Sequence, residues 1–182
     1  MMRDKTVLLG VTGSIAAYKA VDLASKLTQS GAKVDVVMTE CATQFVTPLS
    51  FSSITHRRTV TDMFDAPDEF EIEHIALAER ADVVVIAPAT ANVIARLAAG
   101  IADDMLTCSV LATRAPVILA PAMNVNMWEN GITQENTAKL RARGFKVVEP
   151  GTGSLACGAE GKGRLADLED ILTAINQALR VK

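Results

Sequence analysis

Five short runs rich in β-branched residues or leucine recur along the chain, each followed by turn residues and then by a helical pattern. They occupy residues 6–11, 34–38, 83–86, 117–119 and 145–148. None alternates cleanly between apolar and polar residues, as a strand with one solvated face does. The runs therefore predict strands that are buried on both faces, as in a parallel sheet.

The segments between these runs predict helices. The first helical pattern spans residues 17–27, and Gly31 follows it, where a C-terminal glycine is expected. The last places Leu168, Ile171 and Ile175 on one face, with Asp167 as its cap. Strands that alternate with helices predict an α/β fold, a single domain with a doubly wound parallel sheet in a flavodoxin-like or Rossmann-like three-layer sandwich. Residues 48–70 and 150–165 follow neither pattern and are expected to be irregular.

Composition and charge exclude several classes of protein. The net charge is −3, and the densest basic spots, Arg57-Arg58 and Arg141 with Arg143, are expected to be solvated surface, so no nucleic-acid partner is expected. The longest apolar run, residues 82–89, is far shorter than the roughly 20 residues that span a bilayer. Three cysteines without a Cys-x-x-Cys pair support neither a disulfide framework nor a metal site. We expect a soluble, cytoplasmic protein without a membrane partner.

The unusual motifs all follow the ends of predicted strands. They are Thr-Gly-Ser-Ile at 12–15, Thr-Glu at 39–40, Pro-Ala-Thr-Ala-Asn at 88–92, Pro-Ala-Met-Asn at 121–124 and the glycine-rich segment 151–164. Because ligands of open α/β sheets bind beyond the carboxyl ends of the strands, we expect these motifs to form one site. The prolines are expected to end strand pairing.

The motif at residues 12–15 predicts a phosphate site. Gly13 lets the backbone approach a ligand, and Ser14 is expected to cap the following helix, whose first N–H groups suit an anion. An ordinary strand-to-helix turn fits the same residues equally well. The Gly-x-Gly-x-x-Gly fingerprint is absent, which favours a small phosphorylated ligand over a dinucleotide. Thr39 and Thr90 add hydroxyl groups at neighbouring strand ends, although Thr90 also suits a helix cap.

Three residues are candidates for chemistry. His74 is the chain's plausible proton-transfer imidazole, although a histidine in such a place is more often structural. Asn124 precedes the only tryptophan and offers both a donor and acceptors. Cys157 lies among glycines, a poor setting for core packing, whereas Cys41 and Cys108 are expected to be small core residues.

These motifs, taken in order, resemble the homo-oligomeric FMN-containing cysteine decarboxylases. The resemblance runs from about residue 5 to residue 179 and includes His-Ile-x-Leu at 74–77, Pro-Ala-Met-Asn-x-x-Met-Trp at 121–128 and Ala-Cys-Gly at 156–158. Within that family, the chain is similar to the enzymes that decarboxylate 4′-phosphopantothenoylcysteine to 4′-phosphopantetheine in coenzyme A biosynthesis. One departure is Asp103-Asp104, where the family pattern leads us to expect an amide in one of the two places.

The resemblance implies a cofactor, a set of site residues and an assembly. The chain, residues 1–182, would be an FMN-binding decarboxylase domain in a homotrimer or a dodecamer of trimers. The phosphopantothenate–cysteine ligase would be either a separate protein or a half removed from a longer chain. His74, possibly from a neighbouring subunit, Asn124 and Cys157 would be catalytic, and residues 153–164 would close as a clamp. The implied FMN contacts are Gly13, Ser14, Ile15, Thr39, Thr90, Ala91 and Asn92. The implied substrate contacts are Asn124, Met127, Ala156, Gly158 and Arg164.

The implied chemistry is an FMN-dependent oxidation of the cysteine side chain to a thioaldehyde, loss of CO2 and reduction of the enethiol, with Cys157 supplying a proton. Two alternatives keep the fold and the flavin: a decarboxylase of peptides that end in cysteine, and a non-catalytic FMN-binding regulatory subunit. A flavin prenyltransferase is disfavoured by the glycine-cysteine loop. An NAD-dependent enzyme is disfavoured by the missing glycine fingerprint.

Overall fold

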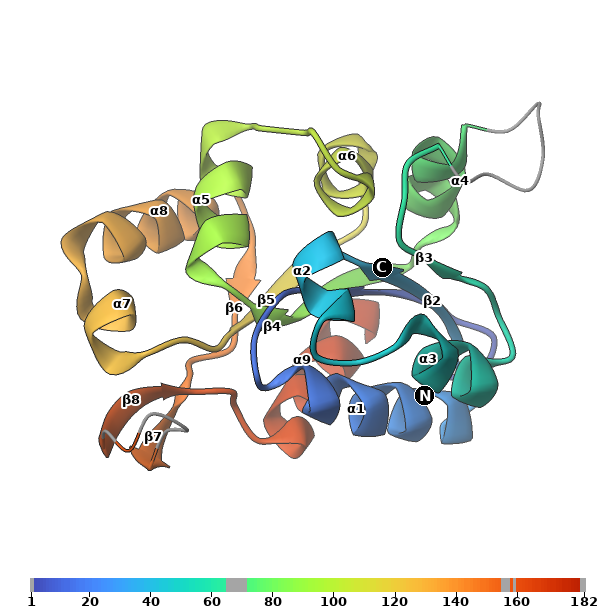
Figure 1. The fold of residues 1–182 in the computed structure, drawn as a ribbon. Helices are drawn as coiled ribbons and strands as arrows, with labels where there is room; N and C mark the ends of the chain where they lie inside the picture. The colour runs from blue at the N-terminus through green and yellow to red at the C-terminus, as the bar shows by residue number, and fades with distance from the viewer. Residues whose placement is uncertain (1, 65–71, 155–157, 159, 181–182) are drawn as a thin grey trace.

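A computed structural model describes residues 2–64, 72–154, 158 and 160–180. Within this part of the chain, six parallel strands form one sheet in the order β3-β2-β1-β4-β5-β6 (Figure 1). Their bounds are β1 (Thr6–Val11), β2 (Lys33–Met38), β3 (Thr59–Val60), β4 (Val83–Ala89), β5 (Val117–Pro121) and β6 (Lys146–Val147). In this order the strands run outward in both directions from the β1–β4 pair, which is the Rossmann-type doubly wound order. The predicted α/β fold with a doubly wound parallel sheet is confirmed.

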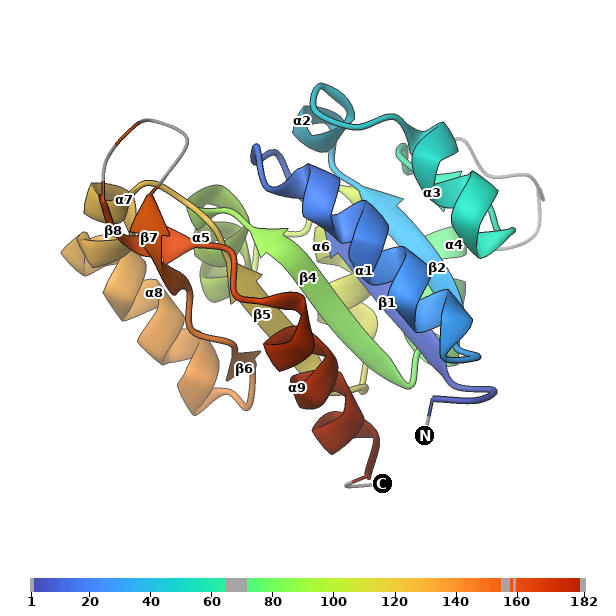
Figure 2. The ribbon, with the colours of Figure 1, turned by 90° about the horizontal axis from the view of Figure 1, so that it is seen from below.

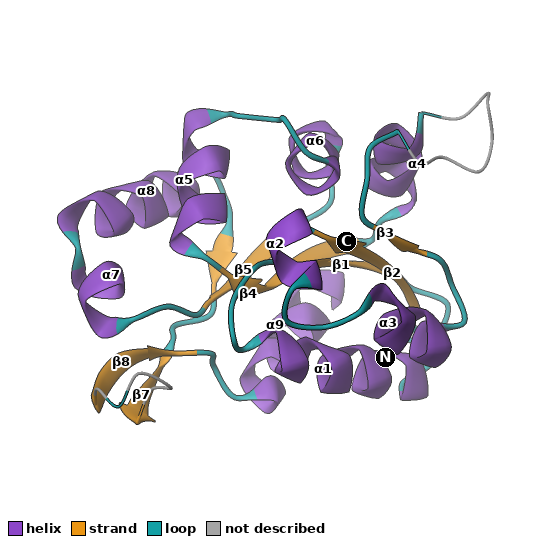
Figure 3. Cartoon of the chain, viewed as in Figure 1, coloured by secondary structure: helices purple, strands orange, loops and turns teal. Residues whose placement is uncertain are grey.

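Helices cover both faces of the sheet (Figure 3). One face carries α1 (Ala17–Gln29), α3 (Pro48–Thr55) and α9 (Leu168–Arg180). The other carries α4 (Glu73–Arg80), α5 (Ala91–Ala99), α6 (Met105–Ala112) and α8 (Gly131–Ala142). Two short helices, α2 (Glu40–Thr43) and α7 (Val125–Glu129), follow the carboxyl ends of β2 and β5. The three-layer sandwich is therefore as predicted.

The side chains of β1 show why its sequence does not alternate in polarity. Val7 and Leu9 pack into the apolar cluster beneath α1 and α9, whereas Leu8 packs into the cluster beneath α4, α5 and α6. All three side chains are fully buried. Burial on both faces requires apolar residues at every position, which produces the unbroken run that the sequence shows.

The predicted strands and helices agree with the structure apart from their ends. The helical patterns correspond to α1 and α9, and all five predicted runs form strands. The expectation that Pro88 ends pairing is wrong, because β4 continues to Ala89, which pairs with Pro121 after a shift in register. The second proline fits its expected place, at the end of β5.

Both segments that were expected to be irregular contain regular structure. Residues 48–70 include α3 and the short strand β3, which pairs with β2. In the segment 150–165, β7 (Gly151–Ser154) and β8 (Glu160–Arg164) form an antiparallel pair. This pair lies apart from the main sheet and beside α7 (Figure 2). The expected clamp segment therefore has the form of a β-ribbon in its described residues.

Among the described residues, no helix is both long and apolar enough to cross a membrane.

Candidate functional site

The turn between β1 and α1 places Ser14 at the carboxyl edge of the sheet. The expectation that Ser14 caps α1 is wrong, because the helix begins only at Ala17 and Ala16 occupies the cap position without a side-chain cap bond. Ser14 instead forms a tight turn: its N–H donates to Thr12 O at 2.8 Å, and its hydroxyl accepts from Ala16 N at 3.3 Å. The delayed helix leaves a polar turn where the phosphate site was predicted.

Thr12 joins the ends of the two central strands. Its hydroxyl donates to Pro88 O at 2.7 Å and accepts from Thr90 N at 3.1 Å. Thr90 in turn caps α5 by accepting from Val93 N at 3.3 Å, so the cap suggested by the sequence is present. These bonds hold the turns after β1 and β4 side by side. Thr12 belongs to the first strand-end motif, but the sequence did not indicate that its hydroxyl links these two turns.

The turn after β5 positions Asn124. The side-chain Oδ1 of Asn124 accepts from Asn126 N at 2.9 Å and so caps α7. The turn is also bound to the β-ribbon, because Met123 N donates to Gly163 O at 2.9 Å. A Cβ on Gly163 would lie 2.4 Å from Met123 O, so only glycine allows this approach. The ribbon and Asn124 are thus fixed to each other by backbone contact.

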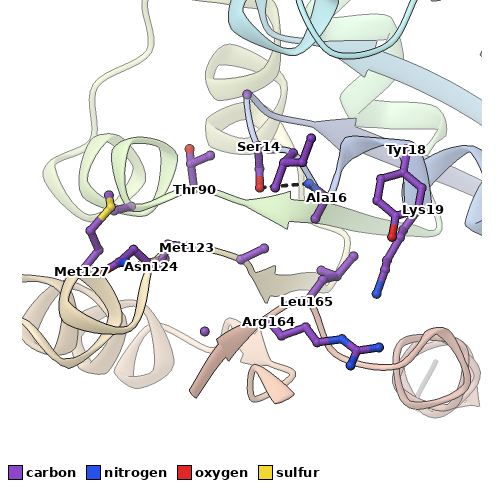
Figure 4. Close-up of a pocket in the computed structure, with 15 residues that line it drawn as sticks. Ser14, Ala16, Tyr18, Lys19, Thr90, Met123, Asn124, Met127, Arg164 and Leu165 are labelled. Atoms are coloured by element: carbon purple, nitrogen blue, oxygen red, sulfur yellow. Dashed lines mark hydrogen bonds between the residues drawn. The ribbon is translucent and has the colours of Figure 1, made fainter. Parts of the chain in front are cut away.

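These turns enclose a cavity of about 390 Å³, which we call the Ser14 pocket (Figure 4). Its volume lies in the range of small-molecule sites. It is lined by Gly13, Ser14, Ile15, Ala16, Tyr18, Lys19, Thr90, Ala91, Ala122, Met123, Asn124, Met127, Gly163, Arg164 and Leu165. Eight of the expected site residues meet there: Gly13, Ser14, Ile15, Thr90, Ala91, Asn124, Met127 and Arg164. Ala122, Met123 and Gly163 belong to the strand-end motifs that were expected to form the site, whereas Ala16, Tyr18, Lys19 and Leu165 were given no role from the sequence.

A second cavity of about 420 Å³, the Thr39 pocket, lies at the ends of β2 and β3. It is lined by Met38, Thr39, Glu40, Thr43, Thr61, Asp62, Met63, Phe64, Asp103, Asp104, Met105 and Leu106. The Oγ1 atom of Thr39 is buried there without a hydrogen-bond partner among the described residues. Thr39 and Ser14 thus line two different pockets at the carboxyl edge of the sheet. The exposed Asn92 lines neither pocket.

The acidic pair at one wall of the Thr39 pocket is held by Arg96. Its two terminal nitrogens lie 2.6 Å from Asp103 Oδ2 and 2.6 Å from Asp104 Oδ2. Asp104 also forms a capping box with Thr107 at the start of α6. Burial, together with the charges of Asp104 and Asp103, raises the pKa of the Cys108 thiol above its usual value. The two carboxylates thus bind Arg96, and one of them also caps α6. An amide was expected at one of these positions, and a carboxylate can fill both roles there.

Within one chain, the structure does not bring His74 and Asn124 together. His74 lies in the first turn of α4, half-buried, and lines neither pocket. In Figures 1 and 2, α4 and α7 lie at opposite sides of the molecule. Cys157 and Ala156 lie outside the described residues, and Gly158 is exposed. Cys41 is exposed, so the expectation that it is a core residue is wrong.

The chain matches known proteins over nearly its whole length. A model of the family described as "Flavoprotein" matches residues 1–180. The chain is 49% identical over 172 residues to the coenzyme A biosynthesis bifunctional protein CoaBC of Bacillus subtilis, covering 94% of this chain but only 42% of that protein. It is 45% identical over 177 residues to a probable phosphopantothenoylcysteine decarboxylase of Streptococcus mutans, covering 96% of this chain and 99% of the relative. The chain thus spans less than half the length of the bifunctional relatives.

Two solved structures share the fold closely. The FMN-dependent cysteine decarboxylase SpaF has a TM-score of 0.86 and 36% identity, covering 100% of this chain and 98% of that one. A cysteine-to-serine mutant of PPC decarboxylase, complexed with pantothenoylaminoethenethiol, has a TM-score of 0.87 and 32% identity, covering 96% and 98%. The chain belongs to the flavoprotein family, among the FMN-dependent cysteine decarboxylases that share its fold.

Proposed function

We propose that this chain is an FMN-dependent carboxy-lyase that converts 4′-phosphopantothenoylcysteine to 4′-phosphopantetheine and CO2. The observation that carries the proposal is the Ser14 pocket, which collects the turns after β1, β4 and β5 in a chain 45% identical to a probable phosphopantothenoylcysteine decarboxylase. The bifunctional relatives, named for coenzyme A biosynthesis, support the same assignment.

The residues at the carboxyl edge fit a flavin mononucleotide. Buried hydroxyl groups are nearly always hydrogen-bonded, so the unpartnered Oγ1 of Thr39 suits a polar group of a ligand. The turn containing Gly13, Ser14 and Ile15 offers backbone N–H groups and a hydroxyl to the phosphate. Thr39 and the segment from Thr90 to Asn92 would hold the rest of the cofactor, which would extend across both pockets.

Simple loss of CO2 from an α-amido carboxylate leaves a carbanion with no place for its charge. FMN, when bound, supplies the electron sink that lets the cysteine side chain take up this charge. The net reaction replaces one C–C bond with a C–H bond, so a proton must reach the carbon that loses CO2. We assign that proton to Cys157, and we expect His74 to act on the substrate.

Asn124 is the proposed ligand of the substrate carboxylate. Because its Oδ1 accepts the Asn126 N–H, the orientation of the carboxamide is fixed and its nitrogen is the end suited to donate to an anion. Met123, Met127 and Leu165 supply apolar walls to the same pocket. Low polarity there strengthens the hydrogen bond that Asn124 forms with the carboxylate.

A homo-oligomer, a trimer or a dodecamer of trimers, would complete this site. Within one chain, α4 lies far from the Ser14 pocket, so a His74 that acts on substrate must come from a second copy. Ile72 and Ile75, on either side of His74, are 64% and 38% exposed. Apolar side chains around the imidazole fit a surface that a second subunit covers.

The substrate contains an amide between cysteine and phosphopantothenate, so a ligase must supply it. That ligase is a proposed partner, and the bifunctional relatives support a link between the two activities. We place the reaction in the cytoplasm, where this intermediate of coenzyme A biosynthesis would be consumed.

The test incubates the purified, FMN-loaded protein with 4′-phosphopantothenoylcysteine and follows the product by mass spectrometry. We expect the substrate to lose the mass of CO2 and to yield phosphopantetheine. A peptide that ends in cysteine runs in parallel, because decarboxylation of such peptides is the second candidate activity. A protein that binds FMN but decarboxylates neither compound would be the non-catalytic regulatory alternative.

A further inference from the structure

Two cationic side chains converge at one end of the Ser14 pocket. Lys19 comes from the first turn of α1, and Arg164 is the last residue of β8. Figure 4 shows the ends of both side chains extending toward the same region, away from Asn124 and Met127. Both line the pocket, which contains no carboxylate among its described lining residues.

Neither cation forms an ion pair with a described carboxylate. Other cations of the chain do: Lys26 pairs with Glu169, Lys162 with Glu149, and Arg96 with both Asp103 and Asp104. Two like charges that face one region without a counter-ion repel each other. A bound anion would attract both cations and so offset the repulsion between them.

The helix position of Lys19 adds to this preference. The N-terminal end of a helix carries partial positive charge, so a lysine in the first turn is unfavourably placed. The first turn of α1 contains no acidic residue that would offset it, and the favourably placed basic residue is Lys26 in the last turn. The backbone dipole and the two side chains therefore all favour negative charge at this end of the pocket.

We propose that Lys19 and Arg164 form a subsite for the phosphate monoester at the far end of the substrate. The inference rests on the proposed function and extends it to substrate selection. The cysteinyl carboxylate would lie at Asn124, the phosphate at Lys19 and Arg164, and the arm between them along Ala122, Met123 and Leu165. Asn124 and Lys19 lie at opposite ends of the pocket in Figure 4, as an elongated substrate with two anionic ends requires.

The subsite predicts which substrates the enzyme prefers. A phosphorylated pantothenoyl compound gains charge-assisted hydrogen bonds that its dephosphorylated form lacks. A peptide that ends in cysteine offers only its carboxylate and gains nothing from the pair. Lys19 and Arg164 thus favour 4′-phosphopantothenoylcysteine over the peptide alternative.

The test compares binding of 4′-phosphopantetheine and pantetheine to the FMN-loaded protein by titration calorimetry. In Lys19→Met and Arg164→Met, we expect the phosphorylated ligand to bind about tenfold more weakly for each charge removed, as for one charge-assisted hydrogen bond. Affinity for pantetheine should stay unchanged. Lys19→Arg and Arg164→Lys keep the charge and should restore most of the preference. Lys26→Met, on the same helix, and Arg143→Met are matched controls that remove a cation elsewhere.

Two results would overturn the subsite. One is an equal loss of affinity for both ligands, which would make the pair a structural support. The other is weaker FMN binding, measured by flavin fluorescence, with an unchanged preference for the phosphorylated ligand, which would assign the pair to the cofactor phosphate.

Turnover of wild-type protein separates this inference from the proposed function. If the protein prefers phosphopantetheine through Lys19 and Arg164 but releases no CO2, the subsite is supported and the proposed function is contradicted. If wild type and both Met variants decarboxylate the phosphorylated and dephosphorylated substrates equally well, the proposed function is supported and the subsite is contradicted.

Discussion

Arg80, in the last turn of the helix that carries His74, donates from Nε to the carboxylate of Asp35 at 2.7 Å. Asp35 is 3% exposed on β2, and its other oxygen accepts from Arg57 Nε at 2.6 Å. The neighbouring Arg58 pairs with Glu73, directly before His74, at 3.1 Å. Arg57 and Arg58 reach solvent, as expected, and also form ion pairs: Arg57 shares Asp35 with Arg80 of α4, and Arg58 pairs with Glu73 at the start of α4.

Asp35→Asn should therefore destabilise the protein and loosen α4. An amide cannot satisfy two guanidinium groups, and the loss is expected to be about 1–3 kcal/mol, limited because both arginines reach solvent. Urea unfolding followed by circular dichroism measures it. Asp22→Asn, on the exposed surface of α1, is the matched control and should leave the midpoint unchanged. If the Asp35→Asn protein is as stable as wild type, the Asp35 carboxylate does not stabilise the fold through Arg57 and Arg80.

Gly163→Ala should separate the β-ribbon from the turn that carries Asn124. The added Cβ would lie 2.4 Å from Met123 O, a backbone atom, so the ribbon or the turn after β5 must shift to make room. We expect a loss of decarboxylase activity that exceeds the loss of stability, measured as kcat/KM beside the thermal midpoint. Gly131→Ala is the control, because no atom lies within 4 Å of its Cβ position. Equal activity in the two variants would contradict the prediction.

Thr39→Val should affect FMN binding and stability in opposite directions. The buried hydroxyl has no described partner, so replacing it with a methyl group should leave the cofactor-free protein equally stable or slightly more stable. FMN affinity should fall about tenfold, as for one lost hydrogen bond to a charged or strongly polar group. Thr59→Val removes another buried, unpartnered hydroxyl outside both pockets and should leave FMN affinity unchanged. An identical flavin titration for both variants would show that Thr39 does not contact the cofactor.

The main strands could be predicted because a strand buried on both faces requires consecutive apolar residues, which are visible in the sequence. The strand β3 could not, because two residues, Thr59 and Val60, are too few to show a pattern. Ser14 resembles a helix cap in the sequence, but it forms a turn with Thr12 and Ala16, and the helix begins at Ala17. Local sequence does not report which of two short-range bonds a serine adopts.

Much of the site also depends on contacts between distant segments. The acidic partner of Arg57 lies 22 residues earlier in the chain, and no periodic pattern links the two. Lys19 is an ordinary member of a helical pattern until β8, from the other end of the chain, brings Arg164 to the same pocket. The strand-end motifs were informative because parallel strands bring their carboxyl ends together wherever they lie in the sequence.

Cys108 should react more slowly with alkylating agents than the exposed Cys41 at neutral pH. Burial, followed by the charges of Asp104 and Asp103, raises the Cys108 pKa, and the thiolate is the reactive form. Mass mapping after brief treatment with iodoacetamide measures the two rates. Because the folded-state pKa is raised, the native protein binds more protons than the unfolded chain in alkaline solution, and stability should fall as pH rises through that range. Faster labelling of Cys108 than of Cys41 would contradict this environment.

Mixing two inactive variants should restore activity if the site is shared between subunits. His74→Asn removes the imidazole of α4, and Asn124→Ala removes the carboxamide of the Ser14 pocket, so each homo-oligomer lacks one group in every site. The two groups lie far apart in one chain, and a mixed oligomer therefore contains some interfaces that join an intact His74 to an intact Asn124. The measurement is CO2 release after the variants are unfolded together and refolded. A double variant mixed with wild type controls for the refolding yield. If mixtures that contain both chains, verified by native mass spectrometry, remain inactive, then His74 does not reach the pocket of a neighbouring subunit.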